Sequence, residues 1–127
     1  MRRTAVLRLT VLLAFALTMG CLSENKGKIE GTRWTSLAAT FQTLRGSVRR
    51  PDGYVEMHFH TDGSLYFIVQ GKIHTGKYSL GMGNAVTLYL DEAVAGMKTH
   101  TETVVINGDR LTMTDTDGTE LTFRRGN

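Results

Sequence analysis

The chain has 127 residues, a formal net charge of +3 and one cysteine. Three of its 15 basic residues lie in the first 20 positions, which hold no acidic residue, so 12 basic residues face 12 acidic ones in the remainder. A formally neutral domain gives no support to a nucleic-acid partner, and a single cysteine excludes an intrachain disulfide.

Residues 1–20 have the composition of a secretory signal peptide. Arg2, Arg3 and Arg8 form a basic beginning, and an apolar run follows over residues 11–17. That run is shorter than the roughly 20 apolar residues that a membrane-spanning helix requires. The sequence therefore predicts an exported protein from which this segment is removed.

The end of this segment, LTMGC at residues 17–21, resembles the lipobox of bacterial lipoproteins. Thr18 stands three places before the cysteine, where that family usually has leucine, and Leu17 lies one place earlier. The resemblance implies that Cys21 carries acyl chains such as palmitate and becomes the first residue of a membrane-anchored mature chain. Stable anchoring needs more than one such chain. An ordinary cleaved signal followed by an unrelated cysteine is the alternative.

Residues 21–29 are polar and predict a flexible tether to a single domain at residues 30–127. Leu22 follows the cysteine, where an aspartate would resemble an inner-membrane retention signal. The expected location is therefore the bacterial cell envelope, and the outer membrane if the cell has two membranes.

A β-hairpin is predicted over Tyr54–Gln70. Residues 61–63 (Thr-Asp-Gly) suit a three-residue turn, because glycine occupies the position that needs a left-handed backbone. The resulting register pairs Met57 with Phe67 and places the apolar residues of both strands on one face.

Downstream, the same alternation interrupted by glycine-containing turns predicts further strands. Gly71-Lys72 and Asn107-Gly108 suit two-residue turns, and residues 116–118 repeat the Thr-Asp-Gly turn, which pairs Met113 with Leu121. The eight predicted strands are Arg33–Thr40, Tyr54–His60, Ser64–Gln70, Ile73–Leu80, Ala85–Leu90, Lys98–Ile106, Arg110–Asp115 and Thr119–Arg125.

Two segments are assigned no strand. Residues 41–44 form at most one helical turn before Gly46. Residues 91–97 are expected to be a long loop, either a mobile connection or a lid and contact surface at one end of the fold.

Short strands joined by hairpins favour an all-β fold, an eight-stranded antiparallel up-and-down barrel. Pairing the first strand with the last removes the exposed edges that promote aggregation. An eight-stranded barrel has an interior just wide enough to be filled by side chains or to hold one small ligand.

Gly31-Thr32-Arg33-Trp34, followed by hairpins and a basic last strand, resembles the small lipocalin-like barrels of bacteria. In the wider group a Gly-x-Trp opens the first strand, and here one extra residue separates Gly31 from Trp34. The resemblance implies that Trp34 closes the barrel with Arg124 or Arg125 over its ring.

No metal site, cofactor or enzymatic activity is expected. His58 and His60 share a face with Glu56, but the residues opposite them, Tyr66 and Ser64, are poor zinc ligands. A Gly-x-Ser-x-Gly motif and a phosphate-binding glycine loop are both absent from the sequence, and its carboxylates lie mainly at turns. His74 is expected to point inward opposite Val69 as a hydrogen-bonded core residue.

The expected function is that of a membrane-anchored, lipocalin-like binding module for a small apolar ligand or lipid. The alternative is an envelope structural domain, a protein-interaction domain or a protease inhibitor with a filled barrel, whose contacts would be residues 41–53 and 91–97. The residues expected to line the lumen are Met57, Phe59, Leu65, Phe67, Tyr78, Met113 and Phe123.

Overall fold

The computed structural model describes residues 22–126, so the expected signal peptide and Cys21 lie outside the described part. All regular structure in this part is β-strand, which confirms the predicted class. No helix there is long and apolar enough to cross a membrane. The strands are β1 (Thr32–Ser36), β2 (Ala39–Thr43), β3 (Gly46–Arg50), β4 (Val55–Phe59), β5 (Ser64–Val69), β6 (Lys72–Leu80), β7 (Ala85–Val94), β8 (Met97–Asn107), β9 (Arg110–Thr114) and β10 (Glu120–Arg125).

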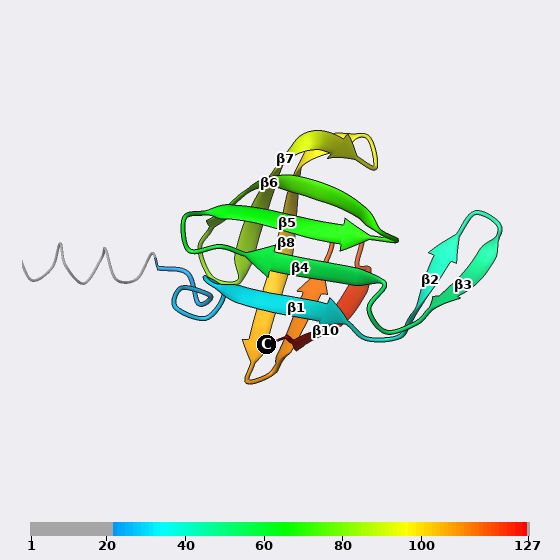
Figure 1. The fold of residues 1–127 in the computed structure, drawn as a ribbon, viewed down its shortest axis with the longest axis horizontal. Coiled ribbons are helices and arrows are strands. Elements are labelled where there is room, and N and C mark those ends of the chain that lie inside the picture. The colour runs from blue at the N-terminus through cyan, green and yellow to red at the C-terminus, as the bar shows by residue number, and fades with distance from the viewer. Residues whose placement is uncertain (1–21, 127) are drawn as a thin grey trace, which may run out of the picture.

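Eight of these strands form a closed antiparallel barrel in the order β1-β10-β9-β8-β7-β6-β5-β4 (Figure 1). The first strand closes the barrel on the last, since Trp34 pairs with Arg125 of β10 on one side and with Met57 of β4 on the other. The predicted eight-stranded barrel is therefore confirmed. Closure satisfies the backbone donors and acceptors that an open sheet would expose at its edges.

The two hairpins with Thr-Asp-Gly turns have the predicted registers. Met57 pairs with Phe67 across β4 and β5, and Met113 pairs with Leu121 across β9 and β10. Gly63 adopts a φ of 90°, the left-handed conformation for which glycine carries no steric penalty. Turn geometry and alternation together specify which face of each strand enters the core.

The prediction for residues 37–50 is wrong. The first strand ends at Ser36 rather than Thr40, and the expected helical turn is replaced by the two-stranded sheet of β2 and β3, in which Phe41 pairs with Val48. This hairpin stands away from the barrel at the right of Figure 1. Phe41, in the middle of β2, contacts the ring of Tyr54 with centroids 5.8 Å apart, which links the hairpin to the residue that precedes β4.

Two further turns differ from expectation. The β5–β6 turn is Gln70-Gly71 rather than Gly71-Lys72, and the expected loop at residues 91–97 is replaced by the tight turn Ala95-Gly96 between extended β7 and β8. Both residues of each turn have positive φ, between 50° and 79°. These are the paired left-handed conformations that match the twist of antiparallel strands. The expected lid at residues 91–97 does not form.

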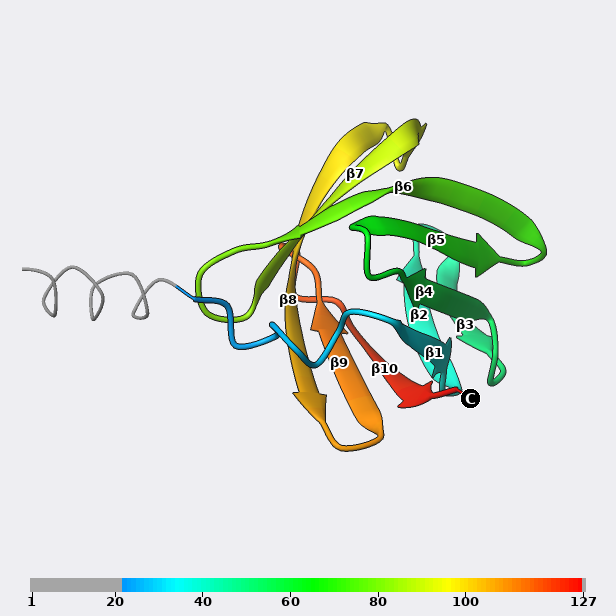
Figure 2. The same cartoon turned by 60° about the vertical axis from the view of Figure 1, so that its left-hand side comes forward.

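The barrel has two different ends, and Figure 2 shows the segment before β1 lying across one of them. This tether end carries the turns at residues 61–63, 81–84 and 108–109. The opposite hairpin end carries the turns at residues 70–71, 95–96 and 115–119, together with the β2–β3 hairpin.

Residues 23–29, predicted as part of a polar tether, pack against the tether end. Ile29 is fully buried, and the Asn25 amide donates a hydrogen bond of 3.0 Å to the carbonyl of Val104. The Glu24 amide donates to the carbonyl of Gly83 at 2.9 Å. The barrel is consequently covered at this end by its own N-terminal segment.

Candidate functional site

Most of the barrel interior is a filled core. Among the residues predicted to line a lumen, Phe59, Leu65 and Phe123 are at most 2% exposed. Met57 and Tyr78 are also buried, and the Tyr78 hydroxyl donates a hydrogen bond of 2.6 Å to the carbonyl of His60. These side chains belong to one buried core, which extends from the tether end to Met57, the partner of Phe67, and they leave little room for a ligand there.

Trp34 and Arg125 seal the tether end. Trp34 is fully buried, and its indole N–H donates a hydrogen bond of 2.7 Å to Thr32 Oγ1. The Arg125 guanidinium lies 4.6 Å from the Trp34 ring centroid and donates to the carbonyl of Gly108 at 3.1 Å. Arg125, which pairs with Trp34, therefore occupies the position over the tryptophan, whereas Arg124 pairs with Thr35. A cation over an indole face contributes about 0.5–2 kcal/mol.

The hairpin end of the interior is less completely packed. Phe67, Met113 and Leu121 are only half-buried, although each points inward and packs against the core. Going toward the hairpin end along β5, β9 and β10, they are the first inward residues after Leu65, Leu111 and Phe123, which are fully buried. The barrel thus presents an apolar layer toward this end, and we call Phe67, Met113 and Leu121 the mouth residues.

Glu102 is a diagonal neighbour of Met113 in the sheet. It is the first inward residue of β8 beyond the fully buried Val104, which pairs with Met113, and it pairs with the buried Val86 of β7. Sequence reasoning overlooked it, although the alternation of Glu102, Val104 and Ile106 along a predicted strand could have identified an inward carboxyl. A charged side chain at an inward position is unusual enough to indicate either a structural network or a binding role.

The Glu102 carboxyl is buried without full hydrogen bonding. Its residue is 8% exposed, and Oε2 is buried with no hydrogen-bond partner in the described part of the chain. Burial raises the pKa of Glu102 from its usual 4.5 to about 7, and the carboxylates of Asp115 and Asp117 act in the same direction. His100 opposes them. The barrel therefore holds an acid that titrates close to neutral pH.

The wild-type protein is expected to lose stability as the pH rises, and replacing Glu102 with glutamine is expected to remove this loss. The folded chain binds this proton more tightly than the unfolded chain, so the stabilisation is complete below the unfolded pKa near 4.5 and disappears as the pH rises through about 7. The whole shift corresponds to about 3 kcal/mol, and solvent access at the hairpin end reduces the expected effect to about 1–2 kcal/mol.

Urea unfolding at about pH 4 and about pH 8 measures this difference. From the lower to the higher pH, the unfolding free energy of the wild type should decrease more than that of Glu102→Gln. Glu120→Gln, on the exposed face of β10, should show the same decrease as the wild type. The same pH dependence in all three proteins would contradict a buried Glu102 carboxyl.

His74 points into the barrel, as expected, but its partner differs. Because the β5–β6 turn is shifted by one residue, His74 pairs with Phe67 rather than Val69. The two rings stack with centroids 4.9 Å apart and planes 20° apart. His74 therefore extends the mouth residues by one aromatic surface.

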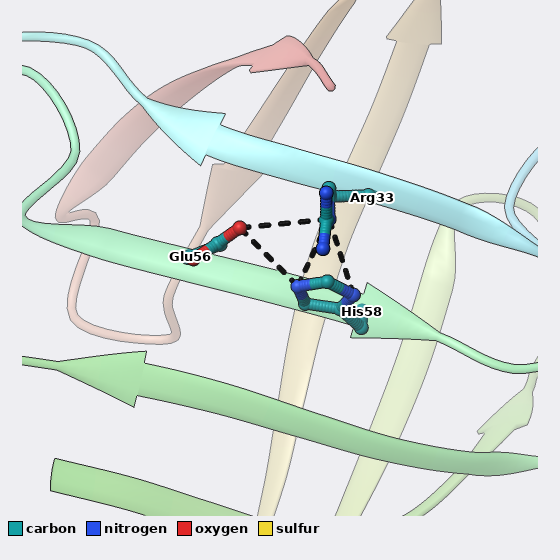
Figure 3. A network of polar contacts seen from close by, with 3 residues as sticks. All are labelled: Arg33, Glu56 and His58. Carbon is teal, nitrogen blue, oxygen red and sulfur yellow. Dashed lines mark hydrogen bonds and ion pairs between the residues drawn. The ribbon is translucent and has the colours of Figure 1, made fainter. Parts of the chain in front are cut away.

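On the outer face of the barrel, Arg33, Glu56 and His58 form a polar network (Figure 3). Glu56 Oε1 lies 3.5 Å from Arg33 Nε and 3.3 Å from His58 Nε2. The His58 ring stacks on Tyr66 with centroids 4.1 Å apart, which leaves His58 only 8% exposed. The cationic Arg33 beside His58 disfavours a metal ion there, and residues 22–126 contain no group of three potential metal ligands.

A surface groove of about 790 Å³ adjoins this network at the tether end. Its charged residues include Arg33, Arg125 and Asp62, and His60 also lines it. Hydrogen bonds from the Ser64 hydroxyl and amide lower the pKa of Asp62. The groove therefore combines guanidinium groups with a carboxylate and does not concentrate charge of one sign.

Comparisons with protein-family models, with curated proteins and with solved structures find no match for this chain. The described residues nevertheless bring together an apolar interior layer, one carboxyl and a sealed opposite end. An arrangement of apolar lining with a single polar group is typical of small-molecule binding sites.

Proposed function

We propose that this chain is a membrane-anchored lipoprotein whose lipocalin-like barrel binds a small apolar ligand at its hairpin end. The observation that carries this proposal is the half-burial of the inward residues Phe67, Met113 and Leu121 at the hairpin end of a barrel whose core is otherwise mostly buried. Because Trp34 and Arg125 seal the tether end, a ligand would enter between the hairpin-end turns.

The size of the apolar contact limits the expected affinity. A ligand that buries roughly 200 Å² of apolar surface gains roughly 5 kcal/mol from the hydrophobic effect. Loss of translational and rotational freedom offsets part of this gain. We expect dissociation constants in the micromolar range or weaker, and compounds with a single chain or ring system rather than large lipids.

The substitution Met113→Trp is expected to abolish ligand binding by filling the mouth. The measurement is fluorescence titration with the neutral apolar probe N-phenylnaphthylamine, whose emission rises when it leaves water. Met82→Trp is the matched control, because Met82 is exposed in the β6–β7 turn at the opposite end. Binding by the control but not by Met113→Trp supports the mouth as the site. Unchanged binding by both variants, or no binding by the wild type, contradicts the proposal.

Anchoring through Cys21 would orient this mouth away from the membrane. Ser23 already contacts Gly83 at the tether end, and two residues of extended chain span at most about 7 Å. The tether end would therefore lie against the lipid surface.

Cys21→Ser is expected to release the protein from the membrane fraction and to abolish incorporation of radiolabelled palmitate. Export of an unacylated, soluble wild-type protein would refute the anchor.

A protein-binding role is the second candidate, favoured by the β2–β3 hairpin. The hairpin projects from the barrel, and Leu44 at its tip is fully exposed (Figure 1). An exposed apolar side chain at the tip of a projecting ribbon suits a contact with another protein. Two results together would establish this role instead. The wild type would bind no apolar probe, and Leu44→Ser would no longer bind a protein partner that the wild type binds.

A further inference from the structure

Glu102 is an inward carboxyl diagonally adjacent to the mouth residue Met113. Its carboxyl projects inward from β8, next to Val104, which pairs with Met113. Its Oε2 is buried with no partner among the described residues. A buried carboxyl oxygen left without a donor costs about 1–3 kcal/mol or more. A donor from outside the chain would recover that free energy.

The neighbouring side chains do not supply this donor. His100 precedes Glu102 on the same inward face, but its Nε2 lies 3.0 Å from the carbonyl of Val94 and 2.9 Å from that of Met97. That nitrogen is therefore occupied at the hairpin-end turn. Asp115 and Asp117, the other charged groups that act on Glu102, are carboxylates and cannot donate when ionised.

The charged groups around Glu102 determine which kind of hydrogen-bond donor would bind its carboxyl most favourably. Asp115 and Asp117 both oppose a negative charge on Glu102 and His100 favours one, so two acidic side chains and one imidazole act on the inward carboxyl. A positively charged group that enters there would interact favourably with all of these carboxylates. A ligand carboxylate would instead be repelled.

We propose that the ligand of this barrel is an apolar compound with a protonated amine, whose apolar part contacts Phe67, Met113 and Leu121 and whose ammonium group donates hydrogen bonds to Glu102. This inference rests on the proposed binding function and specifies the ligand class for the same site. A hydrogen bond between an ammonium group and a carboxylate is shorter and stronger than one between neutral groups.

The experiment compares three ten-carbon compounds that differ at their polar end, namely decylamine, decanol and decanoic acid, below their micellar concentrations. The sample is the chain from residue 22 onward, which contains every strand of the closed barrel and its core. Each compound competes with N-phenylnaphthylamine for the wild type, for Glu102→Gln and for Glu120→Gln. The last variant makes the same chemical change on the exposed face of β10. Thermal melting establishes that each variant is folded.

For the wild type and Glu120→Gln, decylamine is expected to compete about tenfold to a hundredfold more strongly than decanol, with decanoic acid weakest. Glu102→Gln should lose this preference while it keeps its affinity for decanol. Equal binding of all three compounds, or a preference for the amine that persists in Glu102→Gln, overturns the inference and leaves the apolar site intact. Failure of every decyl compound and of the probe to bind the wild type overturns the proposed function as well.

Discussion

Replacing Gly76 with alanine is expected to destabilise the barrel by at least about 3 kcal/mol. Gly76 lies within β6, where it pairs with Leu65 of β5 and Leu90 of β7. A Cβ atom at this position would lie 2.3 Å from the carbonyl oxygen of Tyr89 and 3.0 Å from the Cα of Leu90. Both contacts are with backbone atoms, so no side chain can rotate to relieve them, and the β6–β7 ladder itself must separate.

Urea unfolding followed by circular dichroism measures the effect. Lys77→Ala is the matched control, because Lys77 is the next residue of β6 and is exposed. The control should unfold within about 0.5 kcal/mol of the wild type, as surface substitutions commonly do. A Gly76→Ala protein that unfolds together with this control would show that β6 and β7 are not as close as described.

Replacing Trp34 with alanine is expected to cost about 3–5 kcal/mol of unfolding free energy. Trp34 is fully buried at the tether end, so truncation removes a large apolar contact and leaves a cavity beneath Arg125. The Arg125 guanidinium would then also lose the aromatic face on which it lies. Because Trp34 is the only tryptophan in the chain, Trp34→Ala removes the intrinsic tryptophan fluorescence, and circular dichroism must report unfolding.

The two arginines at the end of β10 provide an internal comparison for the same seal. Arg125→Ala should destabilise the barrel by about 1 kcal/mol through loss of the contact with the indole ring. Arg124→Ala should have little effect, because Arg124 pairs with Thr35 and points to the outer face, away from the indole ring. Equal effects of the two substitutions would contradict the assignment of Arg125 to the seal.

Features of the fold that depend on neighbours in sequence could be predicted. Residues 54–70 alternate regularly, and Gly63 suits the left-handed position of a three-residue turn. The predicted register was correct because a shift by one residue would expose the apolar face. The same reasoning was correct for residues 110–125.

Two turns whose first residue is neither glycine nor asparagine, Gln70-Gly71 and Ala95-Gly96, were not placed correctly, although each contains a glycine. Residues 91–97 were expected to form a long loop, yet Ala95 adopts a φ of 52° and the strands continue on both sides. Pairing with the adjacent strand provides the hydrogen bonds that outweigh this local cost. The β2–β3 hairpin was overlooked because Phe41 and Val48 face each other only after Leu44 and Arg45 form its turn.

The candidate site depended on closure of the barrel. Phe67 and Met113 were predicted as inward residues, but nothing local indicated that they would remain half-buried while Leu65 and Phe123 became fully buried. The difference arises because the N-terminal segment and Trp34 cover one end, whereas no comparable segment among the described residues packs over the mouth residues. Burial of an inward residue is decided by which end of the barrel it approaches.

The sequence by itself determined that this chain forms an antiparallel barrel of eight strands, because alternation and turn chemistry act over a few residues and agree with one another. Only the tertiary structure decided that Arg125 rather than Arg124 covers Trp34, that residues 23–29 close one end, and that Glu102 is buried without a partner. These outcomes depend on which distant strands meet when the barrel closes, and that information lies in the stagger of the whole sheet rather than in any local segment.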